Sequence, residues 1–246
     1  MRTPRPRWVR ISVAAGRHEK TLDFKGILPF EDIPENDRSN KIIFKTGEYI
    51  MAKLYYQGHG SVRITASDGR VVYVDPFAGG GYGPPADIVL ITHQHGDHNK
   101  IELITQKPGC RIIANEQALA SGKHNSFDLD GIKIQAVAAQ NSNHDPKVSV
   151  GYIITVDGVK VYVSGDTSKT EQMSEFAALN LDYALLCTDG IYNMGLEEAA
   201  ECAELIGAKH NIPFHIVFEE LFDRALAETW TAPNRLILEP GEEVPL

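Results

Sequence analysis

The sequence predicts an α/β (α+β) fold in which two mixed sheets pack against each other and helices cover their outer faces. Two observations support this prediction. Residues 51–75 alternate short β-branched runs with turn residues, which is typical of adjacent strands in a meander. Residues 169–238 instead alternate strand-like with helix-like segments. Because a sheet must bury its apolar face against another layer, this order favours two packed sheets with outer helices.

The strands are predicted from runs of β-branched and apolar residues between turn signals. The continuous apolar run 87–92 indicates a strand that is covered on both faces. Asp157-Gly158 indicates a tight turn that joins two strands as a hairpin. The predicted strands are residues 52–56, 61–66, 70–75, 87–92, 111–114, 132–138, 149–156, 159–164, 183–187, 212–217 and 236–238.

The helices are predicted between and after these strands. A glycine-rich loop, 78–85, precedes the strand at 87–92. Apolar residues recur at helical spacing in 219–229, which is typical of an amphipathic helix that packs on a core. The predicted helices are residues 99–105, 115–121, 169–179, 196–207 and 219–229.

The composition is that of an ordinary soluble globular protein. Of 246 residues, 43% are hydrophobic and 23% are charged, which excludes a disordered or fibrous chain. We find no apolar run that suits a membrane span or a secretory signal. The three cysteines, Cys110, Cys187 and Cys202, are widely spaced and form no CxxC pair. We therefore expect reduced thiols and a cytoplasmic location.

Charge divides the chain unevenly. Residues 1–50 contain 10 Lys and Arg against 7 Asp and Glu, whereas residues 51–246 contain 14 against 26. An acidic body makes nucleic acid a poor candidate partner. The stretch 29–37 is rich in proline and acid, which suits a linker. We expect residues 1–50 to be a partly flexible extension of a domain at 51–246, packing on that domain or on a neighbour in a homo-oligomer.

One short segment contains several histidine and aspartate side chains close together. His93, His95, Asp97 and His98 follow the strand at 87–92 within six residues. Imidazole and carboxylate groups are expensive to bury without partners, so they are poor material for a core. A solvated polar loop is the alternative interpretation. The spacing His-x-His-x-Asp-His presents two groups of donors from one piece of backbone, and these donors suit zinc, iron or manganese.

This segment resembles the signature of the metallo-β-lactamase superfamily, and the resemblance extends over residues 51–246. The superfamily has a lone histidine before a later strand, an aspartate after another strand and a final histidine near the C-terminus. His144, Asp166 and His215 match these positions in that order. The resemblance implies a four-layer αββα sandwich of two mixed sheets with outer helices.

The resemblance also implies two adjacent divalent metal ions, zinc first and manganese or iron as alternatives. His93, His95 and His144 would bind the first ion, and Asp97, His98 and His215 the second, with Asp166 as the bridge. Two such ions, two carboxylates and a bridging hydroxide leave the centre positive, so it attracts anionic or carbonyl-bearing substrates. Asp97 would also act in catalysis by orienting the nucleophile or relaying a proton.

Segments around these residues resemble the L-ascorbate-6-phosphate lactonase-like branch of the superfamily. They are residues 57–61, 74–76, 189–194 and 206–210. We expect His59, Asp75 and Asp189 to line the pocket or to orient metal ligands. A turn histidine bonded to backbone is the alternative for His59, and an Asp-Pro turn is the alternative for Asp75. Asp189 departs from the small residue expected there.

The predicted function is hydrolysis of a small substrate that contains a carbonyl or phosphoryl group, such as a lactone or an ester, with or without phosphate. Substrate selection is expected in loops 78–85 and 192–196 and after His215. The other histidines, His18, His124 and His210, match no ligand position and are expected to be structural.

Three alternatives remain. A ribonuclease-like phosphodiesterase needs a cationic surface, and only residues 1–10 are suitably basic, a segment that we expect to be a frayed tail. Oxygen chemistry on iron is less favoured because both Asp97 and His98 are present and no flavin module follows. A non-catalytic metal-binding protein would be expected to lack one of the metal ligands, and none of them is missing.

Overall fold

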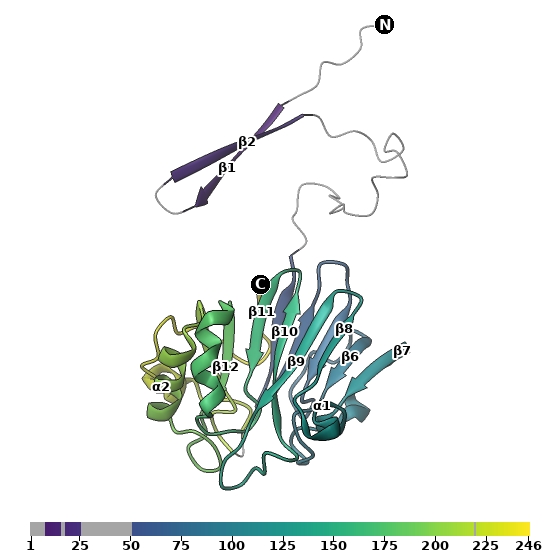
Figure 1. The fold of residues 1–246 in the computed structure, drawn as a ribbon, viewed down its shortest axis with the longest axis vertical. Coiled ribbons are helices and arrows are strands. Elements are labelled where there is room, and N and C mark those ends of the chain that lie inside the picture. The colour runs from purple at the N-terminus through teal and green to yellow at the C-terminus, as the bar shows by residue number, and fades with distance from the viewer. Residues whose placement is uncertain (1–7, 16–17, 26–50, 219) are drawn as a thin grey trace, which may run out of the picture. The chain divides into compact units, whose positions relative to one another are not determined.

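The computed structural model describes residues 8–15, 18–25, 51–218 and 220–246. The chain divides into two units, Met1–Tyr49 and Ile50–Leu246. In the first unit, β1 (Trp8–Ala15) and β2 (His18–Lys25) form an antiparallel hairpin (Figure 1). The basic residues 1–7 and the predicted linker at 29–37 lie outside the described residues.

The second unit contains two mixed six-stranded sheets, which confirms the predicted fold class. In the first sheet the β5–β6 and β6–β7 pairs are parallel and the other pairs are antiparallel. Its strands, in spatial order, are β14 (Glu243–Pro245), β3 (Lys53–Gly58), β4 (Ser61–Thr65), β5 (Val71–Val74), β6 (Ala86–Leu90) and β7 (Gln106–Ile113).

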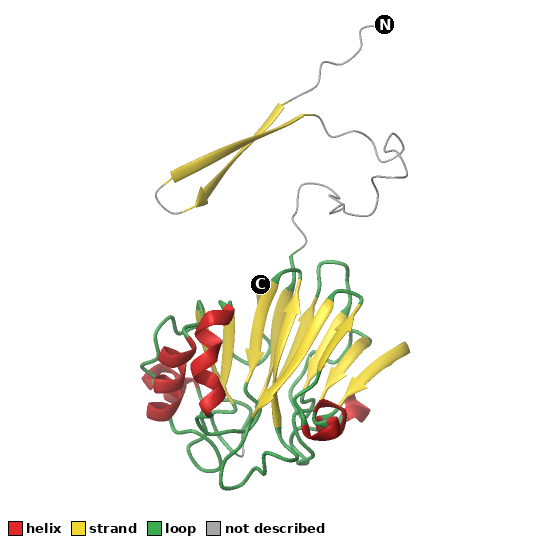
Figure 2. Cartoon of the chain, viewed as in Figure 1, coloured by secondary structure: helices red, strands yellow, loops and turns green. Residues whose placement is uncertain are grey.

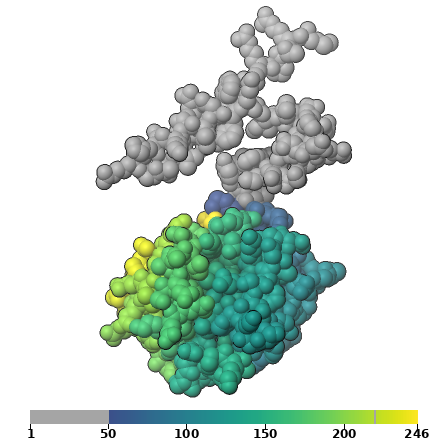
Figure 3. Space-filling view, in the orientation of Figure 1, coloured from purple at the N-terminus to yellow at the C-terminus, as the bar shows by residue number. Residues whose placement is uncertain are grey.

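The second sheet is also mixed. The β11–β12 and β12–β13 pairs are parallel, and the other three pairs are antiparallel. Its strands, in spatial order, are β13 (His210–Phe214), β12 (Tyr183–Cys187), β11 (Val159–Val163), β10 (Val150–Val156), β9 (Ile132–Ala138) and β8 (Ser126–Leu129). In the space-filling view, the teal and green-to-yellow parts of this unit form one continuous surface (Figure 3).

The main core unites buried side chains of both sheets. Leu54 and Tyr56 of β3 belong to the same buried cluster as Tyr152 and Ile154 of β10. Successive residues of a strand point to opposite faces, and in β6 Leu90 therefore joins this cluster while its neighbours join a smaller cluster on the outer face. The continuous apolar run at 87–92 is covered on both faces, as predicted.

Helices lie at the sides of the paired sheets (Figure 2). The longest is α2 (Leu196–Ile206), which contacts β12 and the 3-10 helix Glu171–Leu179. The ring of Tyr162 in β11 packs edge-on against Phe176 of that 3-10 helix, with centroids 5.0 Å apart. The remaining helices of the described residues are α1 (Asn115–Ala118), α3 (Arg224–Thr229) and the 3-10 helices Ile101–Leu103 and Ala120–Gly122.

The prediction of a strand at 236–238 is wrong. Leu236 donates one backbone hydrogen bond to Asn211 of β13, and only an isolated bridge joins Asn211 to Arg235. Backbone groups alternate between the two sides of a strand, so Pro213 stands where the next amide on this open edge would be needed. Proline has no N–H, and the pairing therefore stops.

Several helix predictions need correction. Within the segment 169–179, Glu171–Leu179 forms a 3-10 helix, and only Ile101–Leu103 of 99–105 is helical. The helix predicted from 219 begins at Arg224 because the Asp223 side chain accepts a hydrogen bond from the Leu226 amide and caps it.

The strands at the sheet edges were missed in whole or in part. β8 and β14 were not predicted, and β7 begins at Gln106 rather than at 111. Pro108 and Gly109 obscured this start, and an edge strand tolerates both residue types. All three strands lie at an edge of their sheets, where fewer neighbours impose a pattern.

The expectation of unpaired cysteines is met. The three cysteines are free, Cys187 and Cys202 being buried and Cys110 half-buried. None of the described helices has the length and apolarity that a bilayer crossing requires.

Candidate metal centre

The histidine-rich loop begins at the carboxyl end of β6 and is anchored by Asp75. The Asp75 carboxylate accepts hydrogen bonds from the Thr92 amide at 2.7 Å and the Thr92 hydroxyl at 2.6 Å. Its Oδ2 also accepts from His98 Nδ1 at 2.9 Å. Asp75 is fully buried at the end of β5, so it fixes where the loop leaves the sheet.

Three histidines form the first group of donor atoms. His93 Nε2 lies 3.0 Å from His95 Nδ1, and the His144 ring stands nearly perpendicular to the His93 ring. The donor atoms of the three side chains all lie within 4.8 Å of one another. His144 Nδ1 donates to Asn141 Oδ1 at 2.9 Å, which leaves His144 Nε2 without a proton and directed at the group.

A second group consists of His59, Asp97, His98 and His215, again with donor atoms within 4.8 Å of one another. Asp97 Oδ2 lies 3.2 Å from His59 Nε2 and 3.9 Å from the Nε2 atoms of both His98 and His215. His59 stands in the turn between β3 and β4, and its ring lies 3.8 Å from the His215 ring between centroids.

Asp166 lies between the two groups. Its Oδ2 is 3.4 Å from His144 Nε2 of the first group and 3.6 Å from His215 Nε2 of the second. Its Oδ1 is 3.4 Å from His98 Nε2. The structure therefore brings all seven predicted ligand residues together, with the predicted bridge in the middle.

The three supporting residues also lie at this centre. Besides Asp75 and His59, Asp189 places Oδ2 3.3 Å from His215 Nδ1. His59, Asp75 and His215 all have positive φ, between 46° and 52°, although none is glycine. Such backbone strain persists only where the surrounding structure holds it, and it is concentrated at functional sites.

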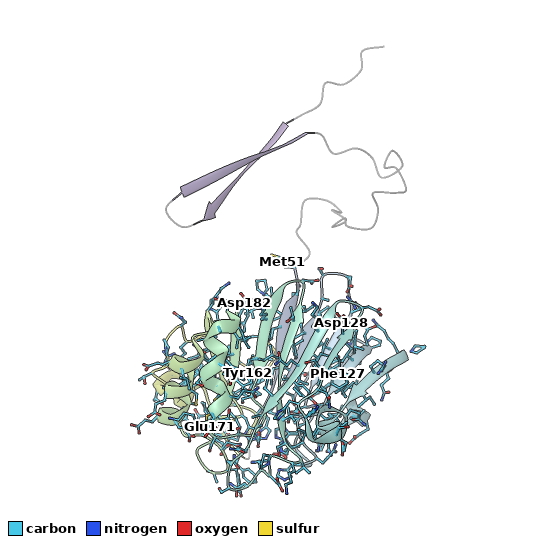
Figure 4. All side chains as sticks on the ribbon, viewed as in Figure 1. Met51, Phe127, Asp128, Tyr162, Glu171 and Asp182 are labelled. Atoms are coloured by element: carbon cyan, nitrogen blue, oxygen red, sulfur yellow. The ribbon has the colours of Figure 1, made fainter. Side chains whose placement is uncertain are left out.

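The remaining histidines are elsewhere. His124 is exposed, and His210 stacks on Tyr183 at the start of β12 and β13. Asp182, the residue before Tyr183, is at the upper edge of the sheets in Figure 4, and these strands run from that edge toward the centre. Of His18 only the backbone is described, in β2.

Burial keeps part of the donor set neutral. It lowers the pKa of His93 to about 2, and it also lowers the pKa of His144. Neutral imidazole is the form that binds a metal. These two side chains are therefore ready as ligands at neutral pH.

Carboxylates raise the pKa of two further histidines, His98 and His215. Burial acts to lower the pKa of His98, but Asp166 and Asp75 raise it well above its usual value. Burial acts likewise on His215, but Asp166 and Asp189 raise its pKa to about 9. In return, and against the effect of burial, His98 and His215 lower the pKa of Asp166 well below its usual range. A cation would replace the protons that balance these acids.

Buried polar atoms without hydrogen-bond partners are a second observation that fits a metal site. Twelve buried side-chain atoms of the described residues have no hydrogen-bond partner, and four of them face the centre: the Nε2 atoms of His98, His144 and His215, and Oδ1 of Asp166. Buried polar atoms are rarely left unpaired, and a bound ion is one of the usual reasons for such an exception. Imidazole nitrogen with carboxylate oxygen is the donor chemistry of zinc, manganese and iron.

Two asparagines at the centre were missed by the sequence analysis. Asn141 bonds His144, and Asn193 donates to both Asp166 and Asp189. Asn193 falls within one of the segments that carried the resemblance, but nothing in the sequence separated its side chain from its neighbours.

Gly60 lies against the second donor group, where little space is left for a side chain. A Cβ at this position would lie 3.0 Å from Cε1 and 3.4 Å from Nδ1 of His98, a ring that Asp75 holds in place. We expect Gly60→Ala to displace the ring and to lower metal affinity roughly 10- to 100-fold. Metal analysis after gel filtration, at matched protein concentration, measures the loss.

The matched control is Gly83→Ala, because a Cβ on Gly83 meets no atom within 4 Å. It should bind metal like the unchanged protein. Equal metal content in the two variants would show that His98 does not bind metal in the observed position.

This arrangement of two mixed sheets around a histidine and aspartate centre defines a protein of the metallo-β-lactamase class. The family model of the β-lactamase superfamily domain matches residues 53–215. The chain therefore belongs to the metallo-β-lactamase superfamily.

Relatives of known sequence refine this result. A UPF0173 metal-dependent hydrolase of Pyrococcus furiosus is 30% identical over 230 residues, which cover 80% of this chain and all of that protein. A similar hydrolase of Thermococcus onnurineus is 33% identical over 192 residues, 67% of this chain and 84% of that protein. The chain is accordingly a metal-dependent hydrolase of this superfamily.

Solved structures agree on the fold. A protein of Parabacteroides distasonis is 30% identical and superposes with a TM-score of 0.61, covering 76% of this chain and 92% of that one. Igni18, a metallo hydrolase of Ignicoccus hospitalis, is 24% identical with the same TM-score and covers 80% and 98% of the two chains. At this lower identity, the second likeness concerns the fold alone.

Proposed function

We propose that this protein hydrolyses a small lactone or ester, with or without a phosphate group, and that it uses two divalent metal ions, zinc in the first instance. The observation that carries the proposal is the position of Asp166, within 3.6 Å of a histidine from each of the two donor groups. A carboxylate in this position can bridge two ions.

The residues divide into two sets of ligands. His93, His95 and His144 would bind one ion, and Asp97, His98 and His215 the other. Ions bound there would supply a nucleophilic hydroxide at neutral pH and would polarise the substrate oxygen. His59 stands beside the second set and holds Asp97 from the side of the β3–β4 turn.

Asp97 is the ligand best placed to take part in catalysis. Its side chain is 29% exposed, whereas those of His98, His215 and Asp166 are 5% exposed or less. His95, in the same loop, is also exposed. The centre therefore faces solvent on the side of His95 and Asp97, and Asp97 can orient a water molecule or accept its proton there.

An aromatic pair marks the substrate side. The Tyr192 and Phe218 rings lie 4.9 Å apart and are 41% and 46% exposed as residues. Phe218 is three residues after His215, and Tyr192 precedes Asn193, which bonds Asp166. Two further residues after His215 are occupied elsewhere: Phe222 packs on Tyr56, and Arg224 forms ion pairs with Glu228 and Glu239.

We expect Phe218→Ala to raise KM about tenfold for esters with an apolar acyl group and to leave kcat for the smallest esters nearly unchanged. Loss of one aromatic contact is worth about 1.5 kcal/mol at most, which is about tenfold. Steady-state kinetics on esters of increasing acyl length measures this. Leu205→Ala, which removes an exposed apolar side chain on α2, is the control. An equal KM in the two variants would show that Phe218 does not contact the substrate.

A small molecule suits this centre better than a nucleic acid does. Residues 51–246, which hold the centre, contain 26 acids against 14 Lys and Arg, and such a surface repels a phosphate backbone. The fold alone does not select the reaction, because CmlA of Streptomyces venezuelae, a diiron β-hydroxylase, has it at 13% identity with a TM-score of 0.57.

The proposal is tested by elemental analysis of the purified full chain, followed by assays on lactones, esters, thioesters and phosphodiesters. We expect two metal ions per chain and turnover of a lactone or ester that His95→Ala abolishes. Full activity in metal-free protein would refute the proposal. Turnover confined to phosphodiesters would favour the ribonuclease-like alternative, and metal binding without turnover of any substrate would favour a binding protein.

A further inference from the structure

A chain of side-chain amides connects the two donor groups behind the ligands. His144 Nδ1 donates to Asn141 Oδ1 at 2.9 Å, and Asn141 Nδ2 donates to Asn193 Oδ1 at 3.0 Å. Asn193 Nδ2 in turn donates to Asp166 Oδ2 at 2.9 Å and to Asp189 Oδ2 at 2.6 Å. Asp189 Oδ2 also faces His215 Nδ1 at 3.3 Å. This hydrogen-bonded network therefore extends from the first donor group, past Asp166, to the second donor group.

The direction of these hydrogen bonds is fixed. Asn141 Oδ1 also accepts from the Asn143 amide at 2.8 Å, so the Asn141 oxygen must lie on that side and its Nδ2 must face Asn193. Asn193 then turns its oxygen to Asn141 and its two N–H groups to the two carboxylates. A flipped amide would set oxygen against carboxylate oxygen, so only one orientation satisfies every group.

The loop that carries Asn193 is held independently of any ion. Asp189 Oδ1 accepts hydrogen bonds from the amides of Ile191 and Tyr192, each at 2.7 Å. The Gly190 amide donates to the Met194 carbonyl at 3.1 Å, and Met194 is buried. Asp189, where a small residue was expected, thus closes the loop with one oxygen and joins the network with the other.

These contacts fix the orientations of the His144 and His215 rings and the position of the Asp166 carboxylate. Because their Nδ1 atoms face Asn141 and Asp189, His144 and His215 direct their Nε2 atoms to the centre. Asn193 fixes Asp166 Oδ2, the oxygen that lies 3.4 and 3.6 Å from those two Nε2 atoms. A displacement of the Asn193 amide therefore disturbs the first group, the bridge and the second group together.

We propose that Asn193 is a positioning residue that supports both metal-binding groups at once, so that its removal weakens the binding of both ions although its side chain binds neither. This inference rests on the two-ion centre of the proposed function. Partners of this kind change metal affinity about 10- to 100-fold when they are removed, and we expect a loss in this range at both steps.

The test is a stepwise metal titration of the full chain, stripped with chelator, using Zn²⁺ with a chromophoric competitor and Co²⁺ with its absorption bands. Asn193→Leu keeps the approximate volume and removes all three hydrogen bonds. We expect both dissociation constants to rise and the Co²⁺ spectrum to change at both equivalents. Asn143→Ala is the control, since the Asn143 side chain is exposed on the neighbouring loop and donates only to the Tyr192 carbonyl, while its backbone amide can still donate to Asn141.

An Asn193→Leu variant that binds both ions like the control would overturn the inference, and so would a loss confined to one of the two steps. In both cases the unchanged protein still binds two ions, and the proposed function stands. An unchanged protein that binds no ion would refute the proposed function as well. Melting of the metal-free variants verifies that they are folded, and Asn193→Ser, judged by the same outcomes, replaces the leucine variant if that does not fold.

Discussion

Replacing Asp166 with asparagine is expected to lower turnover about a thousandfold or more and to leave the fold intact. The side chain keeps its shape, but it loses the charge that faces His98, His144 and His215. A bridging carboxylate holds two cations at a fixed separation, and the charge stabilisation that such ions give a transition state is worth several kcal/mol. Each 1.36 kcal/mol is a factor of ten in rate. Steady-state kinetics and metal analysis of the same preparation measure both effects.

The control for this prediction is Asp182→Asn. Asp182 is also an aspartate at a strand end, but it is half-buried, pairs with Lys209 and accepts from the Lys160 amide at the opposite edge of the sheets (Figure 4). We expect it to retain nearly full turnover. An Asp166→Asn variant that binds two ions and keeps more than a tenth of the normal turnover would show that Asp166 is not the bridge.

The local part of the centre could be predicted from the sequence because it is contiguous. His93, His95, Asp97 and His98 follow a strand whose continuous apolar run identified it, and a strand end is a fixed point at the edge of a sheet. Asp166 could be placed for the same reason, since it follows the clear hairpin around Asp157-Gly158.

The support behind the ligands could not be predicted in the same way. Asn141 and Asn193 are 52 residues apart and meet only because loops of the second sheet converge. Asparagine is common in loops for its turn geometry, so its presence at both positions carried no signal of a network. The strand predicted at 236–238 failed for a similar reason, because the missing N–H of Pro213 matters only once the neighbour of that edge is known.

Both donor groups combine residues of the two sheets. His93 and His95 extend from the first sheet and His144 from the second, and the other group likewise combines His98 with His215. The backbone joins the sheets at the same place, since the His215 amide donates to the His59 carbonyl at 2.9 Å. An ion in either group is therefore a cross-link between the sheets, and metal binding is coupled to the stability of the sandwich.

Removal of the metal is accordingly expected to lower the melting temperature by roughly 10 °C. A ligand present at about a thousand times its dissociation constant stabilises the native state by about 4 kcal/mol. For a domain of this size each kcal/mol corresponds to roughly 2–4 °C. When the ions are removed, carboxylates and imidazoles at the centre stay buried without partners, and this lowers the stability of the native state further. Calorimetry of the chelated and the zinc-loaded protein measures the difference.

The Asp166→Asn variant provides the matched comparison for this experiment, because it changes the residue that lies between the two groups while leaving the rest of the donor set in place. Its melting temperature should respond less to chelator than that of the unchanged protein. Identical melting temperatures for loaded protein and for protein shown by elemental analysis to be free of metal would contradict the cross-link. In that case the ions would bind to a sandwich that is already held together by its core alone, and the buried groups at the centre would cost nothing when left without a cation.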